Sequence, residues 1–280
     1  MDNITFDFKR DGESVLLDGS LFSILDYDGL ESSDYKLDTT ENVNADGERL
    51  KSKKVLSRQI MVEFDYMEFS DIPEMRQKLI RFFSPYSPGT LEVNYLGVTR
   101  QIEYEVSSFK ISSRNVNDQL SCLLYVKCME PSFKTARMGE SIMTLIGGFK
   151  FPLKLPFKLK QFGPLKKNVY NNGHMPAPVE IYFKGPAVNP KAVNHRTGEY
   201  IRIKRTLTSD ETMYINTAFR KKTVVIINGE TREDAWDYLD LSSSFFWLQE
   251  GDNLIEFTSD TEDTKAKGVE IYYQERYLGV

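Results

Sequence analysis

Strict alternation of apolar and polar residues constrains the fold of this 280-residue chain more than any other feature. Side chains two residues apart share one face of a β-strand, so alternation predicts strands with one buried face and one wet face. In the first half of the chain the alternating runs are ITFDF (4–8), IMVEF (60–64), LEVNY (91–95) and IEYEV (102–106). Aromatic residues, 12% of the sequence, also favour strands, and we expect a mainly β protein built from antiparallel pairs.

A single segment has helical periodicity instead. In DIPEMRQKLIRFF (71–83), Met75, Leu79 and the phenylalanine pair at the end recur at helical spacing. Pro73 lies where the first turn would begin, and proline is favourable there because its missing N–H would have no partner in any case. The spacing predicts one helix that ends before Pro85 and packs on the sheet.

Residues 26–54 form a long polar segment between two strand patterns. The segment contains glycines and charged residues and lacks a sustained apolar period. A connection of this length is uncommon as a plain hairpin loop inside a compact domain. We expect a mobile loop or an arm that reaches a neighbouring molecule.

Charge composition changes abruptly near the middle of the chain. No acidic residue occurs between Glu140 and Glu180, while lysines, prolines and two adjacent glycines accumulate in GGFKFPLKLPFKLKQFGPLKK. Glycine and proline prevent a regular helix, so an extended connector is expected, and the short strand patterns that follow predict a β-sandwich. The length allows two cores, and we expect a first domain (1–145), a Lys/Pro-rich connector (146–167) and a second domain (168–280).

The connector alternates lysine with apolar residues, which allows one side to be buried against protein while the other stays in water. It could contact nucleic acid, an acidic membrane surface or a neighbouring subunit, and a plain linker packed on its own subunit is equally consistent. The candidate intersubunit contacts are Lys150, Lys154, Lys158 and Lys160. We hypothesise that the acid-rich stretch 230–263 of a neighbour receives them, since a ring needs two different complementary surfaces.

Composition excludes several classes of protein. A net charge of −5 argues against a general nucleic-acid binder, which needs a basic surface. The N-terminus is acidic where a secretory signal is basic, and no apolar stretch approaches the roughly 20 residues that span a bilayer, so we expect no membrane insertion. Cys122 and Cys128 share one strand face with apolar residues, and we expect buried small hydrophobic side chains and no disulfide framework.

Candidate residues for catalysis or metal binding are few. His174 and His195 are the only histidines, and their turn-like surroundings lack the spacing of a zinc site. Glu103 and Glu105 share one strand face, as the acids of some β-sandwich glycosidases do, but a solvated strand face explains them equally well. No glycine-rich phosphate loop is present. We expect no enzyme activity, no cofactor and no metal ion.

The two tryptophans could provide a surface on which a sugar stacks. Trp247 lies in SSSFFWLQEGDN among apolar neighbours, and we expect it to fill the core. Trp236 lies in EDAWDYLD, flanked by acidic residues, and is the better candidate for an exposed glycan contact.

Several ordered phrases in the second half resemble those of the distal tail proteins (Dit) of long-tailed bacteriophages. The matching phrases cover residues 146–280, and their order carries the resemblance, since each alone is a turn and a strand. They are GGFKFPLKLPF, NNGHMPAPVEIYFKGPAVNP, TGEYIRIKRTLTSDETMYINTAFRKKTVVIING, LDLSSSFFWLQEGDNLIEFTSD and YYQERYLGV. The first half agrees more loosely, through a loop with DGER, the strand that follows it and the single helix.

The resemblance implies an N-terminal split β-barrel-like domain with one α-helix and a C-terminal galectin-like β-sandwich. It further implies a hexameric ring at the virion tail tip, assembled in the host cytoplasm, that joins the tail tube protein to a tail-associated lysin and receptor-binding proteins. DNA would only pass through the ring channel. The galectin likeness concerns architecture only, because Asn194, His195 and Arg196 are consecutive and their side chains would diverge on a strand.

Two other functions remain open at this point. A carbohydrate-binding module that attaches directly to the host wall is the main alternative, and loss of glycan binding in Trp236→Ala would favour it. The third hypothesis is a hydrolase that uses Glu103 and Glu105. It would be supported by hydrolysis of a cell-wall polymer that is lost when either residue is substituted.

Overall fold

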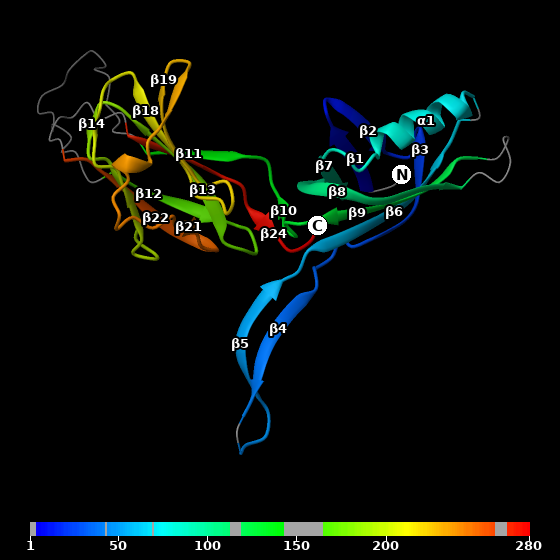
Figure 1. The fold of residues 1–280 in the computed structure, drawn as a ribbon, viewed down its shortest axis with the longest axis horizontal. Coiled ribbons are helices and arrows are strands. Elements are labelled where there is room, and N and C mark those ends of the chain that lie inside the picture. Colours follow the sequence, from blue (N-terminus) through cyan, green and yellow to red (C-terminus); the bar gives the residue numbers. More distant parts are fainter. Residues whose placement is uncertain (1–3, 43, 69, 113–118, 143–164, 261–267) are drawn as a thin grey trace, which may run out of the picture. The chain divides into compact units, whose positions relative to one another are not determined.

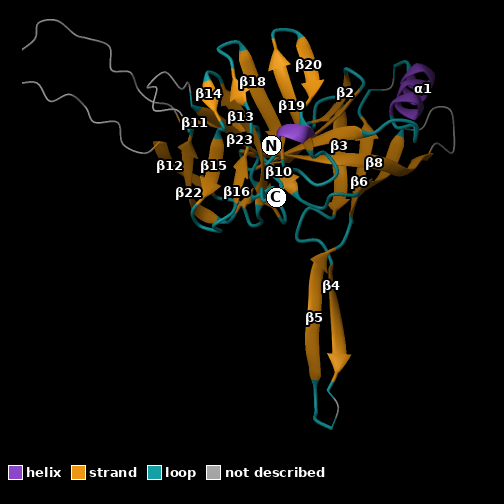
Figure 2. Ribbon diagram, turned by 60° about the vertical axis from the view of Figure 1, so that its left-hand side comes forward, coloured by secondary structure: helices purple, strands orange, loops and turns teal. Residues whose placement is uncertain are grey.

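The chain folds into two compact units in the computed structural model, which describes residues 4–42, 44–68, 70–112, 119–142, 165–260 and 268–280 (Figure 1). Unit 1 contains residues 1–136 and 276–280, and unit 2 contains residues 137–275. Strands dominate both units, and the described residues include one α-helix, α1 (Ile72–Phe82) (Figure 2). The predicted mainly β fold with one helix is therefore confirmed.

Unit 1 is built on an antiparallel sheet with the strand order β2-β1-β7-β8-β9-β6-β3. The four alternating runs in the sequence lie inside β1, β6, β7 and β8. The short pair β10 and β24 attaches to β8. The bounds are β1 (Ile4–Arg10), β2 (Glu13–Leu17), β3 (Phe22–Asp28), β6 (Arg58–Tyr66), β7 (Gly89–Tyr95), β8 (Val98–Ser112), β9 (Ser121–Cys128), β10 (Phe133–Lys134) and β24 (Arg276–Tyr277).

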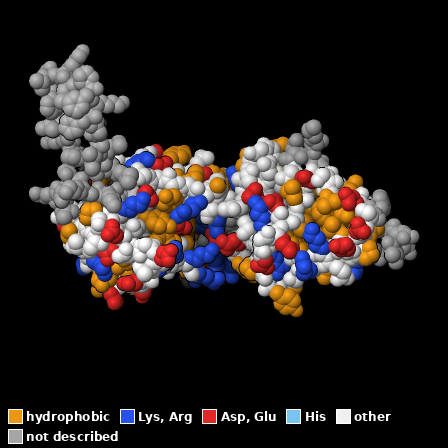
Figure 3. All heavy atoms as spheres, turned by 90° about the horizontal axis from the view of Figure 1, so that it is seen from above, with side chains coloured by type: hydrophobic (Ala, Val, Ile, Leu, Met, Phe, Trp, Pro, Cys, Tyr) orange, Lys and Arg blue, Asp and Glu red, His pale blue; other side chains and the backbone are white. Residues whose placement is uncertain are grey.

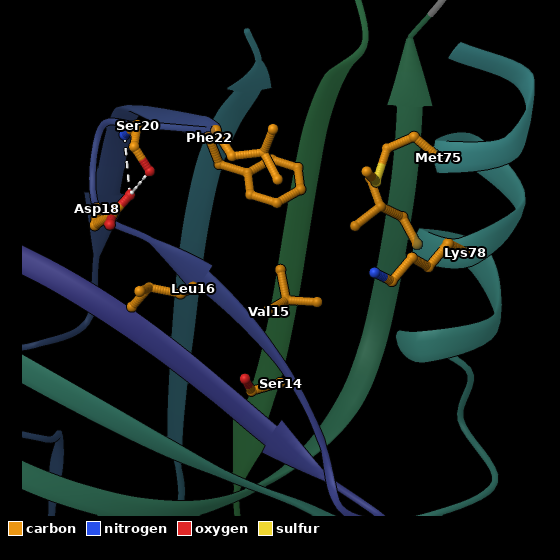
Figure 4. Close-up of a pocket in the computed structure, with 10 residues that line it drawn as sticks. Ser14, Val15, Leu16, Asp18, Ser20, Phe22, Met75 and Lys78 are labelled. Atoms are coloured by element: carbon orange, nitrogen blue, oxygen red, sulfur yellow. Dashed lines mark hydrogen bonds between the residues drawn. The ribbon is translucent and has the colours of Figure 1, made fainter. Parts of the chain in front are cut away.

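The sheet of unit 1 has a bulge in its longest strand and is open between its two end strands. β8 pairs with β7 along its first half and with β9 along its second, and a bulge between Val106 and Ser108 separates the two halves. The end strands β2 and β3 form no ladder with each other, so the described residues contain no closed barrel. α1 lies at this opening, where Met75 faces Val15 and Phe22 (Figure 4).

Aromatic packing and a buried arginine hold α1 against the sheet. Phe83, the residue after the helix, packs edge-on against Phe8 with ring centroids 5.4 Å apart. Arg10 is 7% exposed, and its Nη1 donates to the carbonyl oxygens of Phe82 at 2.6 Å and Ser84 at 2.5 Å. These carbonyls end the helix and have no partner within it, so the guanidinium caps the C-terminus of α1.

The last residues of the chain return to unit 1 after unit 2 is complete. Phe133 pairs with Tyr277 and Lys134 pairs with Arg276, so the strand that leaves unit 1 lies beside the strand that re-enters it. Nη2 of Arg276 lies 3.0 Å from Oε1 of Glu130, an ion pair that also joins these two stretches.

The unit boundaries differ from those expected from composition. β11 (Met138–Ile142) belongs to the sheet of unit 2, although the expected first domain extended to residue 145. Residues 276–280 belong to unit 1, although the whole end of the chain was assigned to the second domain. Most of the expected connector lies outside the described residues. A tail that pairs with a distant strand leaves no local signal in composition.

Arg58 fixes the returning tail by contacts with four carbonyl oxygens. Its side chain is almost fully buried, in a residue only 3% exposed. The guanidinium donates to the carbonyls of Pro131 at 3.1 Å, Gly29 at 2.7 Å, Glu31 at 2.5 Å and Leu278. A buried cation is stable only when its donors are paired, so this geometry joins three distant segments at one point.

Unit 2 consists of two main antiparallel sheets that pack face to face. The larger has the order β11-β23-β13-β18-β19-β20 with β21 on β13, and the smaller has the order β12-β22-β15-β16. Phe183 of β13 and Phe257 of β22 meet between them, with ring centroids 6.0 Å apart. The resulting β-sandwich confirms the fold expected for the second half.

The remaining strands of unit 2 follow the alternation closely, with every second residue buried in β13 and β23. A short β14 (Ala187–Val188) and β17 (Thr206–Leu207) pair with each other, and a 3-10 turn, η1 (Trp236–Tyr238), follows β20. The other bounds are β12 (Leu165–Asn171), β13 (Ala177–Lys184), β15 (Lys191–Asn194), β16 (Tyr200–Arg202), β18 (Glu211–Asn216), β19 (Thr223–Asn228), β20 (Thr231–Asp234), β21 (Trp247–Leu248), β22 (Gly251–Thr258) and β23 (Val269–Tyr273).

Arg58→Met should destabilise unit 1 selectively. The substitution removes the shared donor of four carbonyls, and we expect a loss of about 3 kcal/mol in the free energy of unfolding. Both tryptophans of the chain lie in unit 2, so tryptophan fluorescence follows unit 2 while far-UV circular dichroism follows both units. In urea titrations the dichroism should gain an early transition, with the fluorescence midpoint unchanged. Arg49→Met, at an exposed position, is the control, and equal curves for both variants would refute the role of Arg58.

Candidate functional site

A two-stranded arm projects from unit 1 between β3 and β6 (Figures 1 and 2). It consists of β4 (Tyr35–Glu41) and β5 (Glu48–Val55), which pair only with each other. Nearly every described residue of the two strands is exposed. Of the two alternatives expected for residues 26–54, a mobile loop or an arm that reaches a neighbour, the structure has a projecting hairpin, formed by strands that the sequence did not indicate. Its contact with a neighbour stays a prediction.

One face of the arm carries all of its large apolar side chains, together with Lys53 opposite Leu37 and the pair Glu41 and Glu48 near the tip, and the other face is polar throughout. Tyr35 pairs with Val55, and Leu37 and Leu50 follow on the same face because a bulge after Asp38 keeps Leu50 aligned. Tyr35, Leu37 and Leu50 are 53%, 60% and 51% exposed, so their rings and side chains remain in water in the isolated chain. The opposite face carries Lys36, Asp38, Thr40, Arg49, Ser52 and Lys54.

The root of the arm is rigid by comparison. Gly29 has a φ of 86° and passes so close to β6 that a Cβ atom there would lie 2.1 Å from the carbonyl oxygen of Gln59. Only glycine fits this approach. The amide of Leu56 donates to the carbonyl of Asp34 at 2.9 Å where the two strands meet the body, and Arg58 holds the carbonyl of Glu31. The arm therefore leaves unit 1 in a defined direction.

An isolated two-stranded hairpin is marginally stable in water, and an exposed apolar face adds a further cost. A partner that covers Leu37 and Leu50 would remove both problems. The chemistry of the arm is that of a protein contact, since it combines aliphatic side chains with a charged rim.

A second apolar surface lies at the opening of the split barrel. A cavity of about 300 Å³ lies between β2, β3 and α1, with Val15, Phe22 and Leu79 among its lining residues (Figure 4). At its rim the Ser20 amide and hydroxyl both donate to one carboxylate oxygen of Asp18, at 2.9 and 2.5 Å, which closes the β2–β3 turn. No pair of catalytic groups converges on this cavity among its lining residues.

The catalytic candidates from the sequence form no reactive constellation in the described residues. Glu103 and Glu105 lie on the outward face of β8, and Glu103 is 3.8 Å from Nζ of Lys134. Burial raises the pKa of both Cys122 and Cys128 to about 12, and neither forms a disulfide. The prediction that these cysteines act as buried hydrophobic side chains is confirmed.

The two histidines lie in different connections of unit 2, His174 between β12 and β13 and His195 between β15 and β16. His174 is exposed near the end of β12. His195 follows β15, and its Nε2 lies 2.5 Å from Oε2 of Glu256, whose other oxygen is 3.3 Å from Nζ of Lys166. Burial alone raises the pKa of Glu256, but the hydrogen bonds from His195 and Lys166 outweigh it and hold that pKa below its usual value. His195 is thus hydrogen-bonded to Glu256, which is also ion-paired with Lys166.

The candidate intersubunit lysines Lys150, Lys154, Lys158 and Lys160 lie outside the described residues. Two lysines from the end of the same basic run are described and have partners within their own chain. Lys166 pairs with Glu256 at 3.3 Å, and Lys167 pairs with Glu140. The intersubunit role of the basic run stays a prediction.

Trp236 is exposed, as the sequence predicted, whereas Trp247 is half-buried and lies outside the core that it was expected to fill. Trp236, on η1, is 41% exposed, and its ring centroid lies 5.7 Å from that of Phe245. Nζ of Lys222 lies 4.8 Å from the same phenylalanine ring. Trp247 is partly buried, and its Nε1 donates to the carbonyl of Thr217 at 3.0 Å. Trp236 and Phe245 thus form a small aromatic surface with a cation beside it.

One cluster escaped the sequence prediction. Tyr182, Tyr214 and Tyr272 lie on three adjacent strands of the larger sheet and contact one another through their rings. Each tyrosine lies at an outward position of its alternating strand, so the sequence pattern predicted only that its side chain would be exposed to solvent. The available signal was the repetition of tyrosine at outward positions in three strands.

Charge and metal-ligand chemistry add no further site. Among the described residues no three His, Cys, Asp or Glu side chains gather as a metal site would require. Within the same residues no helix has the length and apolar character needed to span a membrane. On the face drawn in Figure 3 acidic and basic side chains are interspersed over most of the surface, and one group of Lys and Arg side chains gathers near the lower middle of the view.

Most of the second unit is similar in sequence to a family of phage tail proteins. Residues 172–277 match the family model described as "Siphovirus-type tail component, C-terminal domain", which confirms the resemblance found in the sequence over that range. The model covers less than half of the chain. No curated protein sequence matches the chain.

Solved structures extend the similarity to the fold of the whole chain. The Dit protein of phage SPP1, described as a paradigm of the hub adsorption apparatus in phages that infect Gram-positive bacteria, aligns with a TM-score of 0.68 and 11% identity, over 97% of this chain and 98% of that one. The baseplate of phage P2 in its activated conformation with calcium aligns with a TM-score of 0.59 and 12% identity, over 99% of both chains. At such identity the shared property is the fold.

Glu256→Gln should make unit 2 less stable in a pH-dependent way. Because the folded-state pKa of Glu256 is depressed, its carboxylate contributes stability above the unfolded-state pKa, and this is lost as pH falls through the folded-state pKa. We expect a loss of about 1 kcal/mol at pH 7 that disappears as the pH falls through the depressed folded-state pKa of Glu256. Urea titrations followed by tryptophan fluorescence measure it, with exposed Glu250→Gln as control. A deficit of equal size at all pH values would contradict the assignment.

Proposed function

We propose that this chain is a structural hub of the tail tip of a long-tailed phage, which forms a ring and holds other tail proteins. The match of residues 172–277 to a siphovirus tail component supports this proposal most directly. The whole-chain fold similarity to a hub protein and to a baseplate component is consistent with it.

The arm is the feature of the chain best suited to ring formation. Its apolar face has no partner strand or helix among the described residues, and its root is held by buried contacts. A contact between the arm of one copy and a different surface of the next is heterologous, and heterologous contacts generate closed rings when the rotation per copy divides a full turn. We propose a hexamer, with the arm as an intersubunit element.

The ring would sit at the end of the tail tube protein and carry a tail-associated lysin and receptor-binding proteins, with DNA passing through its channel. This places the protein at the virion tail tip after assembly in the host cytoplasm. Sandwich faces and loops of unit 2 offer the surfaces for such partners. The hub performs no covalent chemistry, which fits the separated histidines and the high pKa of both cysteines.

The double substitution Leu37→Asp/Leu50→Asp should abolish the oligomer without unfolding the protomer. Both side chains are more than half exposed in the isolated chain, so charges there cost the monomer little but cannot be buried in an interface. Native mass spectrometry should show a hexamer for the wild-type protein and monomers for the variant. The far-UV dichroism of the variant should match that of the wild type.

Thr40→Asp/Lys54→Gln is the matched control, because it makes the same change in net charge on the opposite face of the same two strands, with Asp at 40 opposite Arg49 and a like-charged neighbour of Lys36 removed. The control should remain hexameric. A wild-type protein that stays monomeric, alone and with tail proteins present, would overturn the ring; equal loss of the oligomer in both variants would overturn the role of the apolar face.

Direct attachment to a wall glycan is the second candidate, favoured by the exposed Trp236 ring beside Phe245. An aromatic pair flanked by charged groups can stack on a sugar ring and bind its hydroxyls. We expect Trp236→Phe to keep, and Trp236→Ala to lose, pull-down of the protein by purified bacterial cell walls. Wall binding that is the same for both variants, or no binding by the wild type, would remove this candidate.

A further inference from the structure

The tyrosine cluster on the larger sheet of unit 2 is the most organised aromatic surface in the described residues of that unit. Tyr182 of β13 lies 4.8 Å from Tyr214 of β18 and 5.4 Å from Tyr272 of β23, measured between ring centroids. All three side chains are half-buried and point outward, because the residues between them in each strand face the core. Strand spacing of about 4.8 Å gives the row a length of roughly 10 Å.

Two neighbours fix the position of Tyr272. Its ring lies over the backbone of Gly139, its ladder partner on β11, where a Cβ atom would be 2.5 Å from the ring. The guanidinium of Arg137 lies 4.0 Å from the same ring and donates to Glu180 at 2.5 Å and to the hydroxyl of Tyr182 at 3.1 Å. The aromatic row is therefore ordered before any ligand arrives, which lowers the entropy cost of binding.

The charges around the row balance each other. Arg137 pairs with Glu180, and Lys184 pairs with Glu270, so two cations meet two carboxylates. A carboxylate accepts about four hydrogen bonds and an ammonium donates three, so these groups keep capacity for a ligand. Nδ2 of Asn216 donates to the hydroxyl of Tyr214 at 3.2 Å, which leaves the phenolic proton available to donate.

The side chains of this face distinguish between two kinds of occupant. From Glu180 to Lys184 on β13, and along β18 and β23, every outward residue is aromatic, charged, an amide or a hydroxyl. Aliphatic side chains enter this face only at its edge on β19, where Val225 lies opposite Tyr214 and Ile227 opposite Thr212. The buried core of a protein interface is depleted in charge, and covering two ion pairs with apolar side chains costs desolvation energy. A sugar instead offers C–H groups to aromatic rings and hydroxyls that both donate and accept.

We propose that the face formed by Tyr182, Tyr214 and Tyr272 binds a neutral oligosaccharide, with the rings stacking on sugar units and Arg137, Glu180 and Glu270 bonding their hydroxyls. The neutral class follows from the balanced charges, and the length of the row suits about two sugar units. The site is separate from the Trp236–Phe245 surface, and it adds glycan recognition to a protein whose proposed role is structural.

Saturation-transfer NMR on the full-length protein tests the site with cellotetraose, maltotetraose and chitotetraose as probes. At least one probe should bind, with transfer to its C–H protons. Tyr182→Ala should weaken that binding roughly tenfold, while Tyr182→Phe, which keeps the ring, should lower it less than threefold. Tyr200→Ala, on the smaller sheet, should leave the affinity unchanged.

The fold of each variant is verified by the urea midpoint of tryptophan fluorescence, and Tyr214→Ala serves if Tyr182→Ala is unstable. Binding of none of the three probes overturns the proposal, as does binding that Trp236→Ala abolishes and the tyrosine variants leave intact. If the tyrosine variants instead dissociate the oligomer or release a tail protein, the face is a protein interface. None of these outcomes bears on the family match or on the arm, so the structural role is tested separately.

Discussion

The burial of one arginine is the constraint on which the architecture of unit 1 depends. Arg58 cannot release its charge to solvent, so its donors must be satisfied by backbone carbonyls, and these belong to the root of the arm, the stretch before β10 and the C-terminal tail. Arg100 repeats the principle nearby, because it donates to the carbonyl of Gly279 and lies 3.5 Å from the ring of Tyr277. Unit 1 is complete only when residues 276–280 are packed against it.

The contacts that bind the C-terminal residues to unit 1 also hold the root of the arm. The segment that leads into the arm is held by the same guanidinium that holds the tail, so the direction of the arm depends on contacts formed by the end of the chain. An arm with a fixed root loses less entropy when it meets a partner than a free loop would. The exposed apolar face can then serve a specific contact, where on a flexible hairpin it would favour aggregation.

Sequence periodicity predicted much of the fold because burial of one face is a local property of strands and helices. The alternating runs became β1, β6, β7 and β8, and the helical spacing became α1 within a residue of its predicted limits. The arm was harder, because both of its faces are wet and the apolar residues that would mark a strand are separated by charges and a bulge. Its length and polarity indicated an extension, and its regular hairpin came only with the structure.

The candidate sites also divide into features that the sequence predicted and features that only the structure revealed. The sequence alone determined a mainly β chain with two folded parts, a C-terminal part similar to tail proteins, buried cysteines and an exposed Trp236. These properties are set by residue type and by neighbours along the chain. The tertiary structure decided that the tail belongs to unit 1, that His195 meets Glu256, and that three tyrosines from separate strands form one surface. Each of these depends on which strands lie side by side, and strand order is fixed by long-range packing that no local pattern records.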